Sequence, residues 1–177
     1  MIGAAAVGFA CLVYAYLTIP DVRPLRATNP STTAFIELRA EDARSRGETP
    51  RRVQKWVRYH DISPELKRAV LVAEDDAFWQ HEGVDFEQLQ ESLEVDWAHG
   101  RFLRGGSTIT QQLARNLYFD QEDRSSSSPL RKLREAQLAL RLERSTSKDG
   151  ILELYLNRVY FGNLAYGVEA ASRTLIE

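Results

Sequence analysis

The stretch RGGSTITQQLARN, from Arg104 to Asn116, joins two glycines to a segment rich in hydroxyl and amide side chains. Gly105 and Gly106 allow the backbone to turn sharply and to approach a ligand closely. Thr108 and Gln111 have the S/T-x-x-Q spacing of a capping box, which marks a helix N-terminus whose amides and dipole favour an anion. The stretch therefore predicts a helix that starts at Thr108, and it suits a bound phosphate or diphosphate. On this stretch alone, a well-capped helix without a ligand is the alternative.

Three further motifs accompany this stretch in a fixed order. The pattern E-D-x-x-F-x-x-H-x-G precedes it at 74–83, and R-K-x-x-E at 131–135 and K-x-x-I-L-E-x-Y-L-N at 148–157 follow it. With G-G-S-T-I-T-Q-Q at 105–112, these motifs resemble the peptidoglycan glycosyltransferases that polymerise lipid II. Monofunctional transglycosylases and the N-terminal domain of bifunctional penicillin-binding proteins share this family. The resemblance extends from about Val53 to Ser172.

The sequence around the motifs predicts one helix after another. Ser63 is a suitable N-cap, because Pro64 at the first helical position and Glu65 in the first turn follow it. No alternation of apolar and polar residues predicts a strand. Helices are expected at 63–78, 86–99, 108–118, 129–144, 147–157 and from 168 onward, with a short one at 35–44. The fold class is therefore mainly α, and the resemblance implies a lysozyme-like helical glycosyltransferase domain with a cleft between two lobes.

The N-terminal segment predicts a transmembrane helix. Residues 2–19 carry no charge, and a helix of that length spans roughly 27 Å, close to the hydrocarbon thickness of a bilayer. A cleaved signal peptide is the alternative, but the segment 14–20 lacks a small-x-small cleavage site. We therefore expect a membrane anchor at 1–20, a linker at 21–50 and a glycosyltransferase domain at 51–177. Family domains continue with further helices, so the domain is expected to be truncated at its C-terminus.

Charge and composition limit the possible fold and partners less sharply than the motifs do. The chain of 177 residues is 44% hydrophobic and 27% charged, an ordinary globular mixture, and its net charge of -2 argues against nucleic acid as a partner. The single cysteine excludes an intramolecular disulfide. Arg23 and Arg26 follow the apolar segment and no basic residue precedes it, so the positive-inside rule favours a cytoplasmic domain. The resemblance requires the opposite face, and a missing basic leader or a misassigned start would reconcile the two.

Glu74 is the candidate general base. In its predicted helix it lies four residues after Val70 and eight after Leu66, on the face expected to be apolar. It also lies near the helix C-terminus, where the dipole disfavours a negative charge. Both effects make the carboxylate a stronger base, which suits removal of a proton from a sugar hydroxyl. A structural carboxylate that pairs with His81 or with a neighbouring arginine is the alternative, whereas the resemblance matches Glu74 to the family's catalytic glutamate.

Glu135 is the second candidate carboxylate. It follows Arg131 by four residues and Lys132 by three, so a surface salt bridge of about 0.3–0.5 kcal/mol is the alternative to a functional role. The resemblance implies that Glu135 belongs to the active site, where it orients the donor diphosphate together with Lys132 or binds a divalent cation, Mg²⁺. Arg131 and Lys132 suit phosphates, through a bidentate and a point-charge contact respectively.

The resemblance also implies roles for the other motif residues. The residues expected to contact the substrate or its diphosphate are Gly106, Ser107, Thr108, Gln111, Gln112, Arg115, Arg124, Arg131 and Lys132. The residues expected to support the motifs are Asp75, Phe78, His81, Gly83, Asn116, Lys148, Glu153 and Asn157. Arg115 replaces the family's usual lysine, which keeps the charge but changes its geometry. Of Gln111 and Gln112, one can serve only to cap the helix and not to contact the substrate.

The implied reaction is displacement at an anomeric carbon. The 4-hydroxyl of an incoming lipid II attacks the lipid-linked glycan, forms a β-1,4 bond with inversion and releases polyprenyl diphosphate, which needs a base on one face and charge stabilisation on the other. Lipid II, the nascent glycan strand, membrane lipid and cell-division or elongation proteins are the expected partners. The expected location is the periplasmic face of the bacterial cytoplasmic membrane. An inactive membrane-anchored scaffold and a lysozyme-like lytic enzyme are the alternatives.

Overall fold

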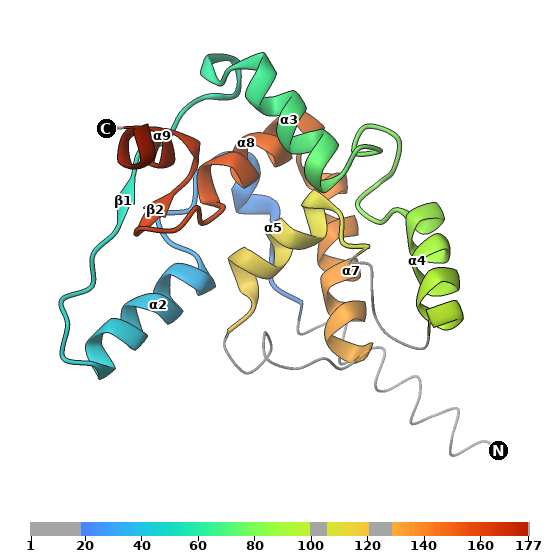
Figure 1. Ribbon diagram of the computed structural model, residues 1–177, viewed down its shortest axis with the longest axis horizontal. Helices are drawn as coiled ribbons and strands as arrows, with labels where there is room; N and C mark the ends of the chain where they lie inside the picture. Colours follow the sequence, from blue (N-terminus) through green and yellow to red (C-terminus); the bar gives the residue numbers. More distant parts are fainter. Residues whose placement is uncertain (1–18, 100–105, 121–128, 177) are drawn as a thin grey trace.

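Helices dominate the computed structural model, which describes residues 19–99, 106–120 and 129–176 (Figure 1). The α-helices of these residues are α2 (Ala34–Ser45), α3 (Pro64–Glu74), α4 (Phe86–His99), α5 (Ile109–Tyr118), α7 (Pro129–Ser145), α8 (Lys148–Arg158) and α9 (Val168–Ile176). Two short 3-10 helices, η1 (Arg23–Arg26) and η2 (Tyr59–Asp61), and two short strands complete them. The mainly α prediction is confirmed, and the arrangement is consistent with a lysozyme-like domain.

The starts of three helices follow from local capping, as the sequence predicts. The hydroxyl of Ser63 accepts a hydrogen bond from the amide of Leu66, at 3.2 Å, and Pro64 occupies the first helical position of α3. At α5, Thr108 and Gln111 make both hydrogen bonds of the capping box. Ser147 caps α8 in the same manner as Ser63 caps α3. These caps confirm the predicted N-termini.

The end of α3 differs from the prediction. The helix ends at Glu74 rather than Phe78, because Asp75 leaves the helical region of the backbone, with φ −167° and ψ 78°. The chain then turns, and Phe78 is fully buried. Four residues that the sequence assigns to the helix therefore form a turn that inserts an aromatic ring into the core.

The core lies where α5 packs against α7 and α8 (Figure 1). Ile109 and Leu113 of α5, one helical turn apart, are fully buried, because this spacing puts them on one face. The core side chains from the other two helices include Leu138, Leu142, Ile151, Leu152 and Leu156. The helix α5, which carries the second motif, is therefore fixed between the helices that carry the third and the fourth.

A short parallel strand pair corrects the expectation of no strand. The strand β1 (Val53–Gln54) pairs with β2 (Ala165–Tyr166), with Val53 opposite Ala165. Strands of two residues are too short to produce an alternating pattern, so the sequence does not reveal them. They join the start of the predicted domain to the segment between α8 and α9.

Part of the predicted linker packs on the domain. The helix α2 lies within 21–50, contacts α5 and buries Ile36. Among the residues that the structure describes, no helix is both long and apolar enough to cross a membrane. The anchor expected at 1–20 lies outside the described residues apart from its last two positions, and it stays a prediction.

Candidate active site

Glu74 is the last residue of α3 and its side chain is exposed. Val70 and Leu71 pack against the core, but no residue of α3 is fully buried, because the helix lies at the surface. Glu74 follows Val70 by one helical turn, as expected, but its own side chain is exposed rather than covered by apolar neighbours. Its carboxylate Oε2 accepts a hydrogen bond from Nε2 of Gln112, at 3.0 Å. The candidate base is accessible from solvent and attached to α5 by one side chain.

Asp75, the next residue, is buried and connects three parts of the site. Its Oδ2 accepts a hydrogen bond from the amide of Ile109, at 2.8 Å, so a carboxylate occupies the N-terminus of α5. Its Oδ1 lies 2.9 Å from Nε2 of His81. Nδ1 of His81 accepts a hydrogen bond from the amide of Gly83, so Nε2 carries the ring proton and donates a hydrogen bond to Asp75. His81 therefore pairs with Asp75. The alternative in which it pairs with Glu74 is wrong.

Gly83 fixes the loop after α3 against α7. Its φ of +93° favours glycine, and a β-carbon there would lie 2.9 Å from the backbone carbon of Ala139. Its carbonyl oxygen accepts a hydrogen bond from the hydroxyl of Thr108, at 2.7 Å. The supporting roles expected for Asp75 and Gly83 thus match contacts within the first motif and with α5.

Side chains of the protein itself occupy the N-terminus of α5. The side chains of Thr108 and Gln111 are buried and satisfy the capping box, and Thr108 also binds Gly83. The first helical amide, of Ile109, is bound to Asp75. Thr108 and Gln111 are therefore engaged within the protein, and their contact with substrate stays a prediction. The anion found at this helix N-terminus is the carboxylate of Asp75. Gly106 lies just before this cap, against Ser92 of α4.

Glu135 lies at the centre of a cationic cluster formed by Arg115, Arg131 and Lys132. The Glu135 side chain is fully buried, and Arg131 donates a short hydrogen bond to it. Nζ of Lys132 is 3.2 Å from the other carboxylate oxygen, and Nη1 of Arg115 is 3.9 Å from Glu135. A surface salt bridge is therefore excluded. Among these four side chains, one carboxylate faces three cations, and all three cationic side chains retain exposed surface.

Two polar side chains join Glu74 to this cationic cluster. Nε2 of Gln112, besides its bond to Glu74, lies 3.4 Å from the carbonyl oxygen of Ser107. The hydroxyl of Ser107 accepts a hydrogen bond from Nζ of Lys132, at 2.5 Å. The structure thus brings together Glu74, Ser107, Gln112, Arg115, Arg131, Lys132 and Glu135 of the predicted site. Arg124 lies outside the described residues.

The environment of Glu135 does not suit a divalent cation. Mg²⁺ binds through carboxylate and other oxygen ligands. Both carboxylate oxygens of Glu135 are already bound by Arg131 and Lys132, whose positive charges would repel a metal ion. Within the described part of the chain, no group of three His, Cys, Asp or Glu side chains is placed to hold one.

The fourth motif binds the domain together. The Asn157 side chain, which is fully buried, accepts a hydrogen bond from the amide of Val57 and donates one to its carbonyl oxygen, at 2.7 and 2.8 Å. Glu153 accepts hydrogen bonds from the ring of Trp56 and the amide of Tyr59. These contacts match the supporting roles expected for Glu153 and Asn157.

Lys148 and Asn116 complete the predicted supporting residues. Nζ of Lys148 donates to Glu143 at 2.8 Å and lies 4.3 Å from the ring centre of Phe78. Lys148 therefore braces the turn that follows α3. Asn116 is half-buried near the end of α5.

Tyr155 of the fourth motif is a residue whose place in the site the sequence does not reveal. Its hydroxyl donates a hydrogen bond to Oε1 of Gln112, at 3.1 Å, and its side chain is buried. The sequence shows only a tyrosine in an apolar helix, and no local signal connects it to a glutamine in another motif.

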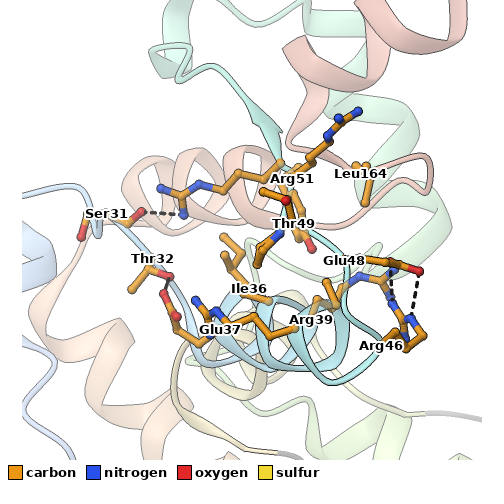
Figure 2. A pocket seen from close by; sticks show the side chains of 16 residues that line it. Ser31, Thr32, Ile36, Glu37, Arg39, Arg46, Glu48, Thr49, Arg51 and Leu164 are labelled. Carbon is orange, nitrogen blue, oxygen red and sulfur yellow. Dashed lines mark hydrogen bonds and ion pairs between the residues drawn. The ribbon is translucent and has the colours of Figure 1, made fainter.

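A cavity of about 770 Å³ lies elsewhere, between α2, the segment 48–52 and β2. Figure 2 shows its charged rim, where Arg46 pairs with Glu48 and Thr32 binds Glu37. None of the predicted site residues lines this cavity. The candidate site is therefore defined by its side-chain contacts, and the predicted cleft between two lobes stays a prediction.

Comparisons with known proteins agree with the motifs. The family model described as Transglycosylase matches residues 42–176. The proteins named biosynthetic peptidoglycan transglycosylase from Nitrosospira multiformis and Aromatoleum aromaticum are 45% and 46% identical to this chain over 145 residues. In both cases the alignment covers 82% of this chain and 61% of the relative. The protein of the same name from Laribacter hongkongensis is 40% identical over 172 residues, which cover 97% of this chain and 73% of the relative.

Proposed function

Since this chain belongs to the transglycosylase family, we propose that it is a peptidoglycan glycosyltransferase that polymerises lipid II into β-1,4-linked glycan. The observation that carries the proposal is the connection of an exposed carboxylate, Glu74, to the cationic cluster of Arg115, Arg131 and Lys132. A base and a diphosphate site that adjoin are what transfer from a sugar diphosphate requires.

In the proposed reaction, Glu74 takes the proton of the acceptor's 4-hydroxyl as that oxygen attacks the anomeric carbon of the donor. The new carbon–oxygen bond forms on the face opposite the breaking one, so the configuration inverts. The bond to the diphosphate breaks with its electron pair, and polyprenyl diphosphate leaves. The guanidinium groups of Arg115 and Arg131 and the ammonium group of Lys132 stabilise the charge that develops on the diphosphate.

Glu135 holds these cations in place. A buried carboxylate contacts three long side chains and restricts their directions, so less conformational freedom is lost when the diphosphate binds. Its contribution is electrostatic and positional, and no step depends on a metal ion.

The proposed substrate also accounts for the expected location. Lipid II carries a polyprenyl tail, so a catalytic domain held at the membrane by residues 1–20 meets its substrate there. We propose a single-pass protein of the bacterial cytoplasmic membrane with its domain on the periplasmic or outer face. Its proposed partners are lipid II, the nascent glycan strand, membrane lipid and proteins of cell division or elongation.

The test is polymerisation of labelled lipid II by the detergent-solubilised chain and by Glu74→Gln. The matched control is Asp76→Asn, because Asp76 is an exposed neighbouring carboxylate outside the motif pattern. We expect glycan from the parent and the control, and at least a hundredfold less from Glu74→Gln, which lacks the general base. Cleavage of purified glycan strands would support a lytic enzyme instead. A folded parent that makes no glycan would support the inactive scaffold.

A further inference from the structure

Gln112 contacts both Glu74 and the buried Tyr155. Nε2 of its amide donates to the carboxylate of Glu74 at 3.0 Å, and its Oε1 accepts from the hydroxyl of Tyr155 at 3.1 Å. The three groups come from α3, α5 and α8. They therefore form a chain of two hydrogen bonds that connects the candidate base to the core.

The direction of these hydrogen bonds is fixed by chemistry. An ionised carboxylate can only accept, so the amide of Gln112 must present its NH₂ group to Glu74. The carbonyl end of the amide then faces Tyr155, whose hydroxyl must donate. Without this donor, the carbonyl end of the Gln112 amide would lose its partner, and only the contacts of Nε2 with Glu74 and with the carbonyl oxygen of Ser107 would orient the amide.

Tyr155 is suited to this donor role. Burial raises the pKa of its hydroxyl, and the negative charge of Glu74 raises it further, so the proton stays on the oxygen at neutral pH. The residue is only 3% exposed, which prevents direct contact with a substrate as large as a lipid-linked sugar. Any effect of the hydroxyl on the reaction must therefore pass through a neighbour.

We propose that Tyr155 is a positioning residue that orients the amide of Gln112 and, through it, the carboxylate of Glu74. Gln112 then acts by holding the base rather than by binding substrate. The inference rests on the proposed function, because it assumes that Glu74 is the base.

The test compares Tyr155→Phe, Gln112→Ala and the double variant. Tyr155→Phe removes one oxygen and keeps the ring, so kcat is expected to fall about tenfold, the effect of one lost hydrogen bond, with less than about a twofold change in KM. Tyr118→Phe is the matched control, because the Tyr118 side chain is also partly buried against the core and lies outside the chain of hydrogen bonds. It is expected to keep the parent's kcat.

The double variant separates positioning from packing. If Tyr155 acts only through Gln112, adding Tyr155→Phe to Gln112→Ala causes no further loss of kcat. A double variant whose loss of kcat equals the product of the two single losses would overturn the proposal. An unchanged kcat in Tyr155→Phe would overturn it as well.

A second measurement does not depend on turnover. The carboxyl ¹³C signal of Glu74, assigned by its loss in Glu74→Gln, is expected to move in Tyr155→Phe and Gln112→Ala and to stay in place in Tyr118→Phe. A protein without glycosyltransferase activity that shows these shifts would refute the proposed function and leave the coupling intact. A Glu74 signal that does not move in Tyr155→Phe would refute the coupling, whether or not the protein is active.

Discussion

Replacement of Gly83 by alanine tests whether the loop after α3 is fixed against α7. Two separate costs arise at this position. A φ of +93° disfavours any residue with a β-carbon, by about 1–2 kcal/mol. The new methyl group would also lie 2.9 Å from the backbone carbon and 3.0 Å from the carbonyl oxygen of Ala139. Backbone atoms of a packed helix cannot move aside as a flexible side chain can, so overpacking adds about 1–3 kcal/mol.

The sum, about 2–5 kcal/mol, is expected to lower the melting temperature of a domain of this size by roughly 5–15 °C. Gly162→Ala is the control, because Gly162 has a similar φ of +90° and nothing within 4 Å of its β-position. Urea and thermal unfolding of both variants isolate the steric cost as the difference between them. Equal losses of unfolding free energy would refute the reasoning, because they would mean that the packing of Gly83 against Ala139 costs nothing.

Two further predictions concern the buried charge and the buried tyrosines. Glu135→Ala removes a fully buried carboxylate from its cationic partners. The free energy of unfolding, measured in urea, should therefore fall by about 3 kcal/mol. A loss of only about 0.3–0.5 kcal/mol, as for an exposed ion pair, would contradict the burial of Glu135. Burial raises the pKa of Tyr118 to about 12 and raises that of Tyr155, so each hydroxyl keeps its proton in the folded state at a pH where the unfolded chain loses it. Their contribution to stability is therefore fully present below the ordinary tyrosine pKa of 10 and is lost as the pH rises through the raised pKa of each hydroxyl, about 12 for Tyr118. Tyr118→Phe should weaken this alkaline loss in unfolding curves recorded at successive pH values.

The features that the sequence predicts well are those with local causes. The N-termini of α3, α5 and α8 follow from Ser63, Thr108 and Ser147, because a cap involves residues only three positions away. The pairing of Val53 with Ala165 has no such signal, because two residues far apart in the sequence form it. The end of α3 was also missed, since the turn that follows it depends on the burial of Phe78 and on contacts of Asp75 with α5.

For the site, the sequence identifies the polar residues but not their surroundings. The sequence places Glu74 on an apolar face, yet its side chain is exposed. For Glu135 a surface salt bridge is the alternative that the sequence leaves open, yet its side chain is fully buried. Helical periodicity indicates which residues share a face, but whether that face is covered depends on where the other helices pack. The contact of Tyr155 with Gln112 arises in the same way, from the packing of α8 against α5.

The same tertiary contacts change the role of the glycine- and hydroxyl-rich motif. Its composition suits a helix N-terminus that binds an anion, and such an anion is present, but it is the carboxylate of Asp75, bound to the amide of Ile109. The hydroxyl of Thr108 and the amide of Gln111 are likewise used within the protein. In the proposed function the cationic side chains bind the diphosphate, and the motif contributes by holding Gln112 beside Glu74, and Ser107 beside Lys132.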